Sequence, residues 1–218
     1  MQLKLRFKVF RKAAIQLLSP TLRAARCCKL LCKKNHQARR KVIIFLNQLY
    51  FYYSLFILAL LLFFCRAKFP TELSLWILVP GCGVVIIAVS RINEIFIAFI
   101  NDATSHLQKK RHFSTIQYFE RIPLAMRSYV ELIVQFAFLY YFIQKFFLLF
   151  NKDRTLFECV YFSAVTITTI GYGDISATHW MSQALCIYEI LAGFALIIIS
   201  FTVYVSRAVG KLQDGKRQ

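Results

Sequence analysis

The sequence predicts an all-α membrane protein with four transmembrane helices and one shorter, re-entrant helix between the third and the fourth. Two observations predict this class. Of the 218 residues, 58% are apolar, and the 28 Lys and Arg residues greatly outnumber the 10 Asp and Glu residues. The charges are also separated along the chain from long apolar stretches, which is typical of membrane spans between basic segments. The same composition excludes a disordered chain.

Residues 1–41 form a basic N-terminal segment that holds 13 of the 28 basic residues and no acidic residue. We expect it to be cytoplasmic and to lie on anionic lipid headgroups. A transit peptide and nucleic-acid binding are alternatives, but the segment is not rich in Ser and nothing beyond charge supports nucleic acid. Cys27, Cys28, Cys32 and His36 could be drawn as a metal site, because Cys28, Cys32 and His36 recur at helical spacing. Free thiols in a basic helix are favoured instead, because the paired Cys arms typical of structural zinc sites are lacking.

The first two predicted transmembrane helices contain no charged residue. Residues 42–64 are long enough to cross a hydrocarbon core of roughly 30 Å. Residues 73–90 form a second span, whose Pro and Gly residues are tolerated when neighbouring helices satisfy the freed backbone groups. Residues 91–128 are expected to form a cytoplasmic linker with an amphipathic helix. Because a voltage sensor needs several Arg residues in one span and only Arg91 stands at a boundary, voltage sensing of that type is disfavoured.

The third and fourth transmembrane helices are predicted at residues 129–150 and 181–206, followed by a short cytoplasmic tail at 207–218. With the N-terminus inside, 23 basic residues fall on the inner segments and four on the outer ones. Basic residues favour the cytoplasmic side of a membrane. We therefore expect a multi-pass protein of a plasma membrane or bacterial inner membrane, with both termini cytoplasmic.

Between these two helices lies an apolar stretch, residues 156–168, that is too short to span. Thr155 and Glu158 have the spacing of a capping box, which predicts a helix start at the outer interface. A helix of this length would end near the middle of the membrane. Its negative dipole end would then favour a dehydrated cation.

The residues after this helix spell T-x-x-T-x-G-Y-G-D, from Thr166 to Asp174. The motif resembles the selectivity filter of the potassium-channel pore family. The resemblance covers residues 129–206 and implies an outer helix, a pore helix (156–168), a filter (169–173) and an inner helix (181–206), with four chains closing a tetrameric pore. It also implies that backbone carbonyls of the filter bind K⁺; the filter residues are Thr169, Ile170, Gly171, Tyr172 and Gly173.

The two filter glycines are expected to supply positive φ angles, which keep successive carbonyls directed to one axis. Ile170 and Tyr172 are expected to pack outward against the pore helix, and Thr169 to add a ring of hydroxyl groups. K⁺ would bind at residues 169–172. Among family members, the positions of Thr166, Asp174, Tyr161 and Phe162 support the filter, and Tyr161 could hydrogen-bond to Asp174.

The inner helix carries three candidates for gating: Gly193 as a hinge, and Ile197 and Phe201 as cavity or gate residues. Helix packing is the alternative for each of them. Glu189 is an ionisable residue within a span and therefore a functional candidate, with a hydrogen bond to pore-helix hydroxyls as the structural alternative. A proline-kinked gate is not available, because no Pro follows the filter.

Together these features predict a homotetrameric, potassium-selective channel that conducts passively, with no enzymatic activity and no cofactor besides the permeant K⁺. A non-selective cation channel and an accessory or silent subunit remain as alternatives. A secondary transporter would show paired broken helices, and only one re-entrant element is visible. The sequence does not indicate the gating stimulus.

Overall fold

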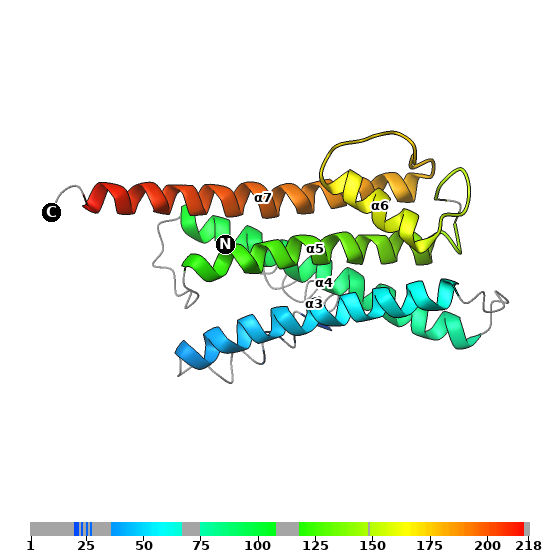
Figure 1. Cartoon of the computed structure of the whole chain (residues 1–218), viewed down its shortest axis with the longest axis horizontal. Helices are drawn as coiled ribbons and strands as arrows, with labels where there is room; N and C mark the ends of the chain where they lie inside the picture. The colour runs from blue at the N-terminus through cyan, green and yellow to red at the C-terminus, as the bar shows by residue number, and fades with distance from the viewer. Residues whose placement is uncertain are drawn as a thin grey trace, which may run out of the picture.

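The computed structural model describes residues 36–66, 75–107, 118–147 and 149–215, together with Pro20, Thr21, Arg23, Ala25 and Cys27. These ranges contain five helices and no strand, so the predicted all-α class is confirmed. Figure 1 shows four long helices and one short helix. Their bounds are α3 His36–Arg66, α4 Leu75–Leu107, α5 Tyr118–Ile143, α6 Leu156–Ile167 and α7 Trp180–Gly215.

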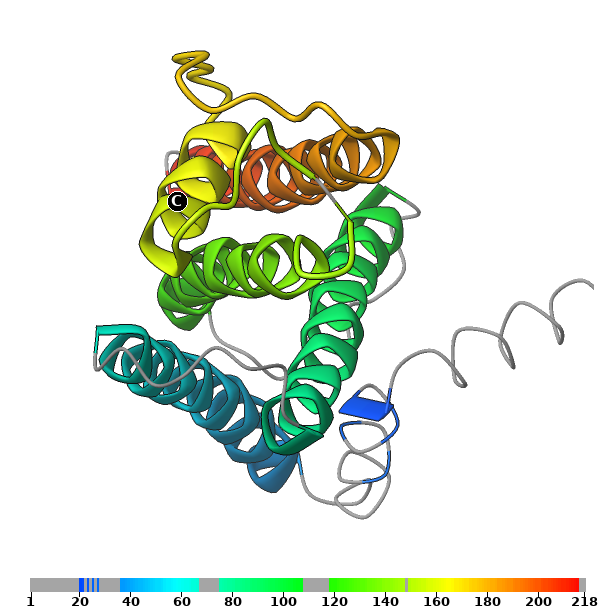
Figure 2. The ribbon, with the colours of Figure 1, turned by 90° about the vertical axis from the view of Figure 1, so that its right-hand side faces the viewer.

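Helix α5 lies at the centre of the bundle. It packs against α3, α4, α6 and α7, and a larger share of it is buried than of any other candidate span in the described ranges. Viewed end-on, α6 and α7 lie on one side of α5 and α3 lies on the other, while α4 flanks both α5 and α7 (Figure 2). Helix α5, the outer helix of the expected pore, is therefore also the helix against which α3 and α4 pack.

All four long helices are apolar enough to cross a membrane. The candidate spans are Arg40–Phe63, Gly81–Asn101, Glu120–Ile143 and Trp180–Ile197. The short helix α6, with 12 residues, is apolar but below spanning length. The chain is therefore a multi-pass membrane protein with one short apolar helix between its last two spans.

The expected linker at residues 91–128 is wrong over much of its length. Helix α4 continues from the expected second span to Leu107, and α5 already begins at Tyr118. Arg91, taken from the sequence as a boundary residue, lies in the middle of the second candidate span and is only 4% exposed. The sequence prediction ended the helix at its first charge, whereas the folded protein gives that charge partners inside the bundle.

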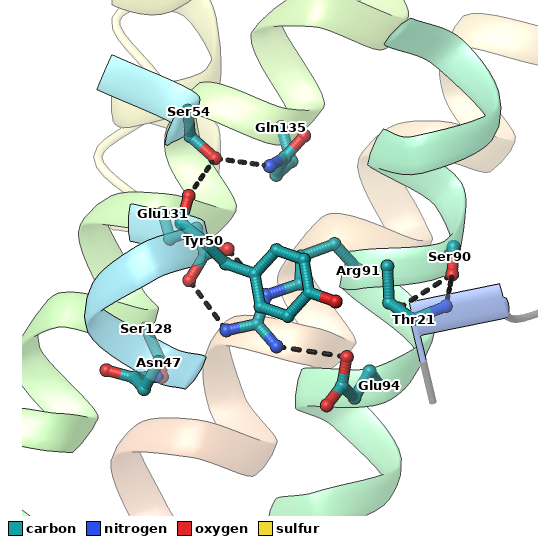
Figure 3. A network of polar contacts seen from close by, with 10 residues as sticks. All are labelled: Thr21, Asn47, Tyr50, Ser54, Ser90, Arg91, Glu94, Ser128, Glu131 and Gln135. Atoms are coloured by element: carbon teal, nitrogen blue, oxygen red, sulfur yellow. Dashed lines mark hydrogen bonds and ion pairs between the residues drawn. The ribbon is translucent and has the colours of Figure 1, made fainter. Parts of the chain in front are cut away.

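Those partners form the Arg91 cluster, made of Arg91, Glu131, Glu94 and Tyr50 (Figure 3). Arg91 Nε lies 2.6 Å from Glu131 Oε1, and Arg91 Nη1 lies 3.0 Å from Glu94 Oε2. The guanidinium carbon lies 4.4 Å from the centre of the Tyr50 ring. The cluster therefore connects α3, α4 and α5 through one buried cation.

The third helix is also displaced relative to the expected residues 129–150. Helix α5 ends at Ile143, and Gln144 leaves the helix to bind the backbone of Arg154 through both of its amide atoms, at 2.8 and 3.0 Å. Leu149 and Phe150 fold back and are buried, with a backbone bridge from Phe150 to Ala177. The chain therefore leaves the helix after Ile143, and Phe150 packs against Phe162 of α6.

At the two ends of the chain, α7 continues to Gly215 and so includes most of the expected tail at 207–218. The N-terminal residues 1–19 lie outside the described part of the chain, and so does the proposed lipid contact of most of that segment. Thr21 is described, and its hydroxyl lies 2.7 Å from the Ser90 hydroxyl on α4. Thr21 therefore contacts α4 beside the Arg91 cluster (Figure 3).

Candidate functional site: the loop from α6 to α7

Helix α6 begins with a complete capping box, as the sequence predicts. The Glu158 backbone N–H donates to Thr155 Oγ1 at 3.2 Å, and the Thr155 N–H donates to Glu158 Oε2 at 2.8 Å. These hydrogen bonds to Thr155 hold the pKa of Glu158 below its usual value. A negative charge at this helix start also complements the positive end of the dipole.

The body of α6 is anchored by its buried face. Phe162 packs edge-on against Tyr140 of α5 and against Phe150, with ring centres 5.1 Å apart in both cases. Cys159 on the same face is fully buried. Phe162, expected from the sequence to support the filter, therefore connects the pore helix to the outer helix.

The end of α6 is closed by a motif that the sequence analysis missed. The Ile170 N–H donates to the Val165 carbonyl at 3.1 Å, and the Thr169 N–H donates to the Thr166 carbonyl at 3.0 Å. This pair of bonds defines a Schellman cap, in which the residue after the cap adopts a left-handed conformation. Thr169 occupies that position with a φ of 59°. Glycine is the usual residue there, which explains why no sequence signal indicated the cap.

Both filter glycines have positive φ, which confirms the prediction. The angles are 61° at Gly171 and 79° at Gly173. A Cβ atom at either position would meet no atom within 4 Å in the single chain. The requirement for glycine at these two positions is therefore conformational and not a matter of space.

The expectation that Ile170 and Tyr172 pack against the pore helix does not hold in the single chain. The two side chains are 55% and 66% exposed. Residues 168–174 stand away from the bundle as a loop between α6 and α7 (Figures 1 and 2). In the single chain the two side chains therefore lack the packing against α6 that the sequence predicts.

The two ends of the loop interact with the rest of the chain, whereas its middle is exposed. Tyr161, on α6, lies near Asp174, and the interaction with that carboxylate raises the pKa of the Tyr161 hydroxyl. Beyond the loop, the Thr178 N–H and the Ser182 hydroxyl both donate to the Leu149 carbonyl, at 3.2 and 2.8 Å. The filter segment therefore lies between two ends that both contact other parts of the chain.

On α7, the three gating candidates differ in their surroundings. Gly193 is buried where α7 meets the end of α6, and a Cβ atom there would lie 2.7 Å from Ile167 Cγ1. Close packing therefore accounts for this glycine, and α7 runs through it as a continuous helix. Ile197 is about half exposed, and the side chain of Phe201 lies outside the described part.

Glu189, one turn before Gly193, is fully buried and meets α5 and α6. It accepts a hydrogen bond from the Tyr140 hydroxyl at 2.9 Å and makes a short contact with the Ser163 hydroxyl. Of the two possibilities that the sequence left open, the hydrogen bond to a pore-helix hydroxyl is what the structure contains. Ser163 and Tyr140 were not singled out from the sequence, because a lone hydroxyl in an apolar helix has no periodic pattern.

No group of three His, Cys, Asp or Glu side chains among the described residues has the arrangement of a metal site. Residues 169–173 offer backbone carbonyl oxygens and the Thr169 hydroxyl, which are oxygen ligands of the kind that hard cations prefer.

Residues 128–209, which include α5 from Ser128 onward, all of α6, the loop and most of α7, match a family model described as an ion channel. No solved structure matches the chain. The match agrees with the resemblance to potassium-channel pores that the filter motif carries. This all-α membrane protein therefore contains, at residues 128–209, a segment that is similar to the ion channel family.

Proposed function

We propose that this chain is a subunit of a potassium-selective channel, in which four copies surround one pore. The observation that carries the proposal is the loop after α6, where the motif from Thr166 to Asp174 has positive φ at both of its glycines. In potassium-selective filters, rings of backbone carbonyls replace the hydration shell of K⁺. In this chain the ion-binding residues would be Thr169, Ile170, Gly171 and Tyr172.

The exposure of the loop supports closure by other copies. At membrane depth, irregular backbone is tolerated only where protein covers it or where it lines a water-filled path, because lipid offers no hydrogen bonds. All residues from Thr168 to Asp174 are exposed in the single chain. Other copies of the same chain would cover one side of each loop and leave the other side to the ions. They would also give Ile170 and Tyr172 the packing surface that one chain lacks.

The direction of α6 supports cation binding as well. Its N-terminus is capped by Thr155 and Glu158, and its C-terminus leads directly into the loop. The partial negative charge at a helix C-terminus favours a cation within about one turn. Ions entering the filter would therefore pass the favourable ends of the pore helices.

The proposal also includes the permeant ion, the membrane topology and the candidate gate. K⁺ would be the permeant ion, with no cofactor and no enzymatic step. Both termini would face the cytoplasm of a plasma or bacterial inner membrane, and the basic N-terminal segment would contact anionic lipid. Gly193, Ile197 and Phe201 stay as candidates for the gate, with Gly193 also explained by its contact with Ile167.

The test is ion flux into liposomes that contain the purified protein, with K⁺ and Na⁺ gradients compared. Wild-type protein should pass K⁺ and exclude Na⁺. Gly173→Ala should lose this selectivity or all flux, because its φ of 79° is strained for an L-residue. The matched control is Gly83→Ala on α4, where a Cβ atom has open space and no positive φ is present.

Equal flux of both ions through wild-type protein would contradict potassium selectivity and indicate a non-selective cation channel. Absence of flux from assembled wild-type protein would indicate an accessory or closed subunit. If wild-type protein is selective but Gly173→Ala and Gly83→Ala give the same flux ratio, the filter loop does not carry the selectivity.

A further inference from the structure

Three helices of the ion-channel module meet at one buried carboxyl group. Glu189 of α7 is 0% exposed and lies between Tyr140 of α5 and Ser163 of α6. We call Glu189, Tyr140, Ser163 and the adjacent Cys186 the Glu189 cluster. Glu189 takes part in no ion pair among the described residues. This carboxyl group therefore lies within a membrane span without a cation beside it.

The hydrogen bonds of Ser163 indicate where the proton must be. The Ser163 hydroxyl lies 2.9 Å from the Ile133 carbonyl oxygen, which can only accept, and it is also in short contact with Glu189 Oε1. A hydroxyl has one proton to donate. When that proton points to Ile133, the contact with Glu189 is a hydrogen bond only if Glu189 carries the second proton.

The other carboxyl oxygen leads to the same arrangement. Tyr140 donates its single hydroxyl proton to Glu189 Oε2 at 2.9 Å, and the Cys186 sulfur lies 3.4 Å from the Tyr140 oxygen. A protonated Glu189 thus accepts from Tyr140 and donates to Ser163, and both oxygens are satisfied. An ionised Glu189 would place an unpaired charge inside a membrane span, which is strongly unfavourable.

We propose that Glu189 is a neutral carboxylic acid that donates a hydrogen bond to Ser163 and thereby positions the pore helix behind the filter. Its role as a positioning residue rests on the proposed function; its protonation state does not. Contacts between α6 and α7 occur in two consecutive turns, Glu189 with Ser163 and Gly193 with Ile167. The filter begins two residues after Ile167, so the orientation of α6 at these contacts sets where the loop starts.

The first experiment measures protonation directly. Infrared difference spectra of wild-type protein minus Glu189→Gln, in H₂O and D₂O, should contain the carbonyl stretch of a protonated carboxylic acid at neutral pH. The matched control is Glu158→Gln, at the solvent-exposed start of α6. That difference spectrum should contain a carboxylate band. A carboxylate band for Glu189 would overturn the proposal, whatever ion the channel conducts.

The second experiment measures positioning through the flux ratio of K⁺ to Na⁺ in liposomes. Glu189→Gln can still donate to Ser163 and accept from Tyr140, so this conservative variant should keep the wild-type ratio within about twofold. Glu189→Leu and Ser163→Ala each remove the hydrogen bond, and the ratio should fall about tenfold in assembled protein. Ser163→Ala, the smaller change, decides the outcome if Glu189→Leu does not assemble.

An unchanged ratio in Ser163→Ala, or a loss of selectivity in Glu189→Gln equal to that in Glu189→Leu, would overturn the positioning role. If wild-type protein itself does not distinguish K⁺ from Na⁺, the proposed function fails. The same variants would then be compared by total flux, and the infrared result still decides the state of Glu189.

Discussion

Glu131 and Glu189 are both fully buried in the bundle, yet their surroundings differ in kind. Glu131 lies against the guanidinium of Arg91, with two hydrogen bonds at 2.6 and 3.1 Å. Among the described residues, the polar side chains beside Glu189 are the hydroxyls of Tyr140 and Ser163 and the thiol of Cys186. A buried charge requires an opposite charge, whereas a protonated carboxyl group requires only donors and acceptors. The same side chain therefore serves as an ion at one site and as a neutral hydrogen-bonding group at the other.

The two clusters also join different parts of the protein to α5. The Arg91 cluster attaches α3 and α4 (Figure 3), and the Glu189 cluster attaches α6 and α7. Neither contact needs to contribute much net stability, because removing two charges or two dipoles from water offsets most of the attraction. The difference becomes visible when one partner is removed, and substitutions of Arg91, Glu131 and Glu189 measure it.

The largest effect is expected from Arg91→Gln. This change leaves Glu131 and Glu94 buried without their cation and should reduce the free energy of unfolding by about 3–5 kcal/mol. Lys145→Gln is the control, since the Lys145 and Asp153 side chains are exposed and 3.8 Å apart, and its effect should stay within about 1 kcal/mol. Thermal or denaturant unfolding in detergent micelles measures both. Equal losses in the free energy of unfolding for the two variants would mean that the ion pairs of Arg91 do not stabilise the bundle.

The same substitution at both carboxyl groups tests the comparison itself. Glu131→Gln removes the charge that faces Arg91 and should cost about 2–3 kcal/mol, although Glu94 remains as a partner. Glu189→Gln keeps a donor and an acceptor in place and should cost less than about 1 kcal/mol. Unfolding of the two variants under identical conditions measures the difference. If Glu189→Gln costs as much as Glu131→Gln, Glu189 is ionised.

Gly193→Ala tests whether steric fit supports the contact between α6 and α7 one turn beyond Glu189. The new methyl group would lie 2.7 Å from Ile167 Cγ1. Overpacking should outweigh the gain in helix propensity and leave a net loss of about 1–2 kcal/mol. The double variant with Ile167→Ala should recover part of this loss by a double-mutant cycle. Gly83→Ala, which has open space, should show no loss; a loss of the same size there would argue against a local clash.

The smallest effect is expected at the start of α6, where Glu158 is a carboxylate in contact with water. Thr155→Ala removes the cap and should cost about 1 kcal/mol at neutral pH. Because the folded state lowers the pKa of Glu158 from its ordinary value of 4.5, this stabilisation is present above about pH 4.5 and is lost as the pH falls through the lowered pKa. The difference in unfolding between wild type and Thr155→Ala should therefore shrink in acid. A difference that does not change with pH would mean that Glu158 takes no part in the cap.

Local features of residues 155–173 could be predicted because they depend on residues close together in the sequence. The capping box of Thr155 and Glu158 and the positive φ of Gly171 and Gly173 depend on residues within a few positions of each other. The number of spans was also predicted from consecutive residues, because a helix needs a minimum apolar length to cross a membrane. The all-α class and the similarity of residues 128–209 to the ion channel family thus follow from the sequence alone.

What the tertiary structure decided concerns polar groups whose partners lie far away in the chain. The sequence placed Arg91 at the end of a helix because it could not show that Glu131, 40 residues later, would pair with it. Similarly, the end of α5 at Ile143 depends on the contact of Gln144 with Arg154, and the setting of Glu189 depends on Tyr140 and Ser163. A single charged or polar residue in a span is read as a boundary when its partner is unknown, because only the partner makes its burial favourable.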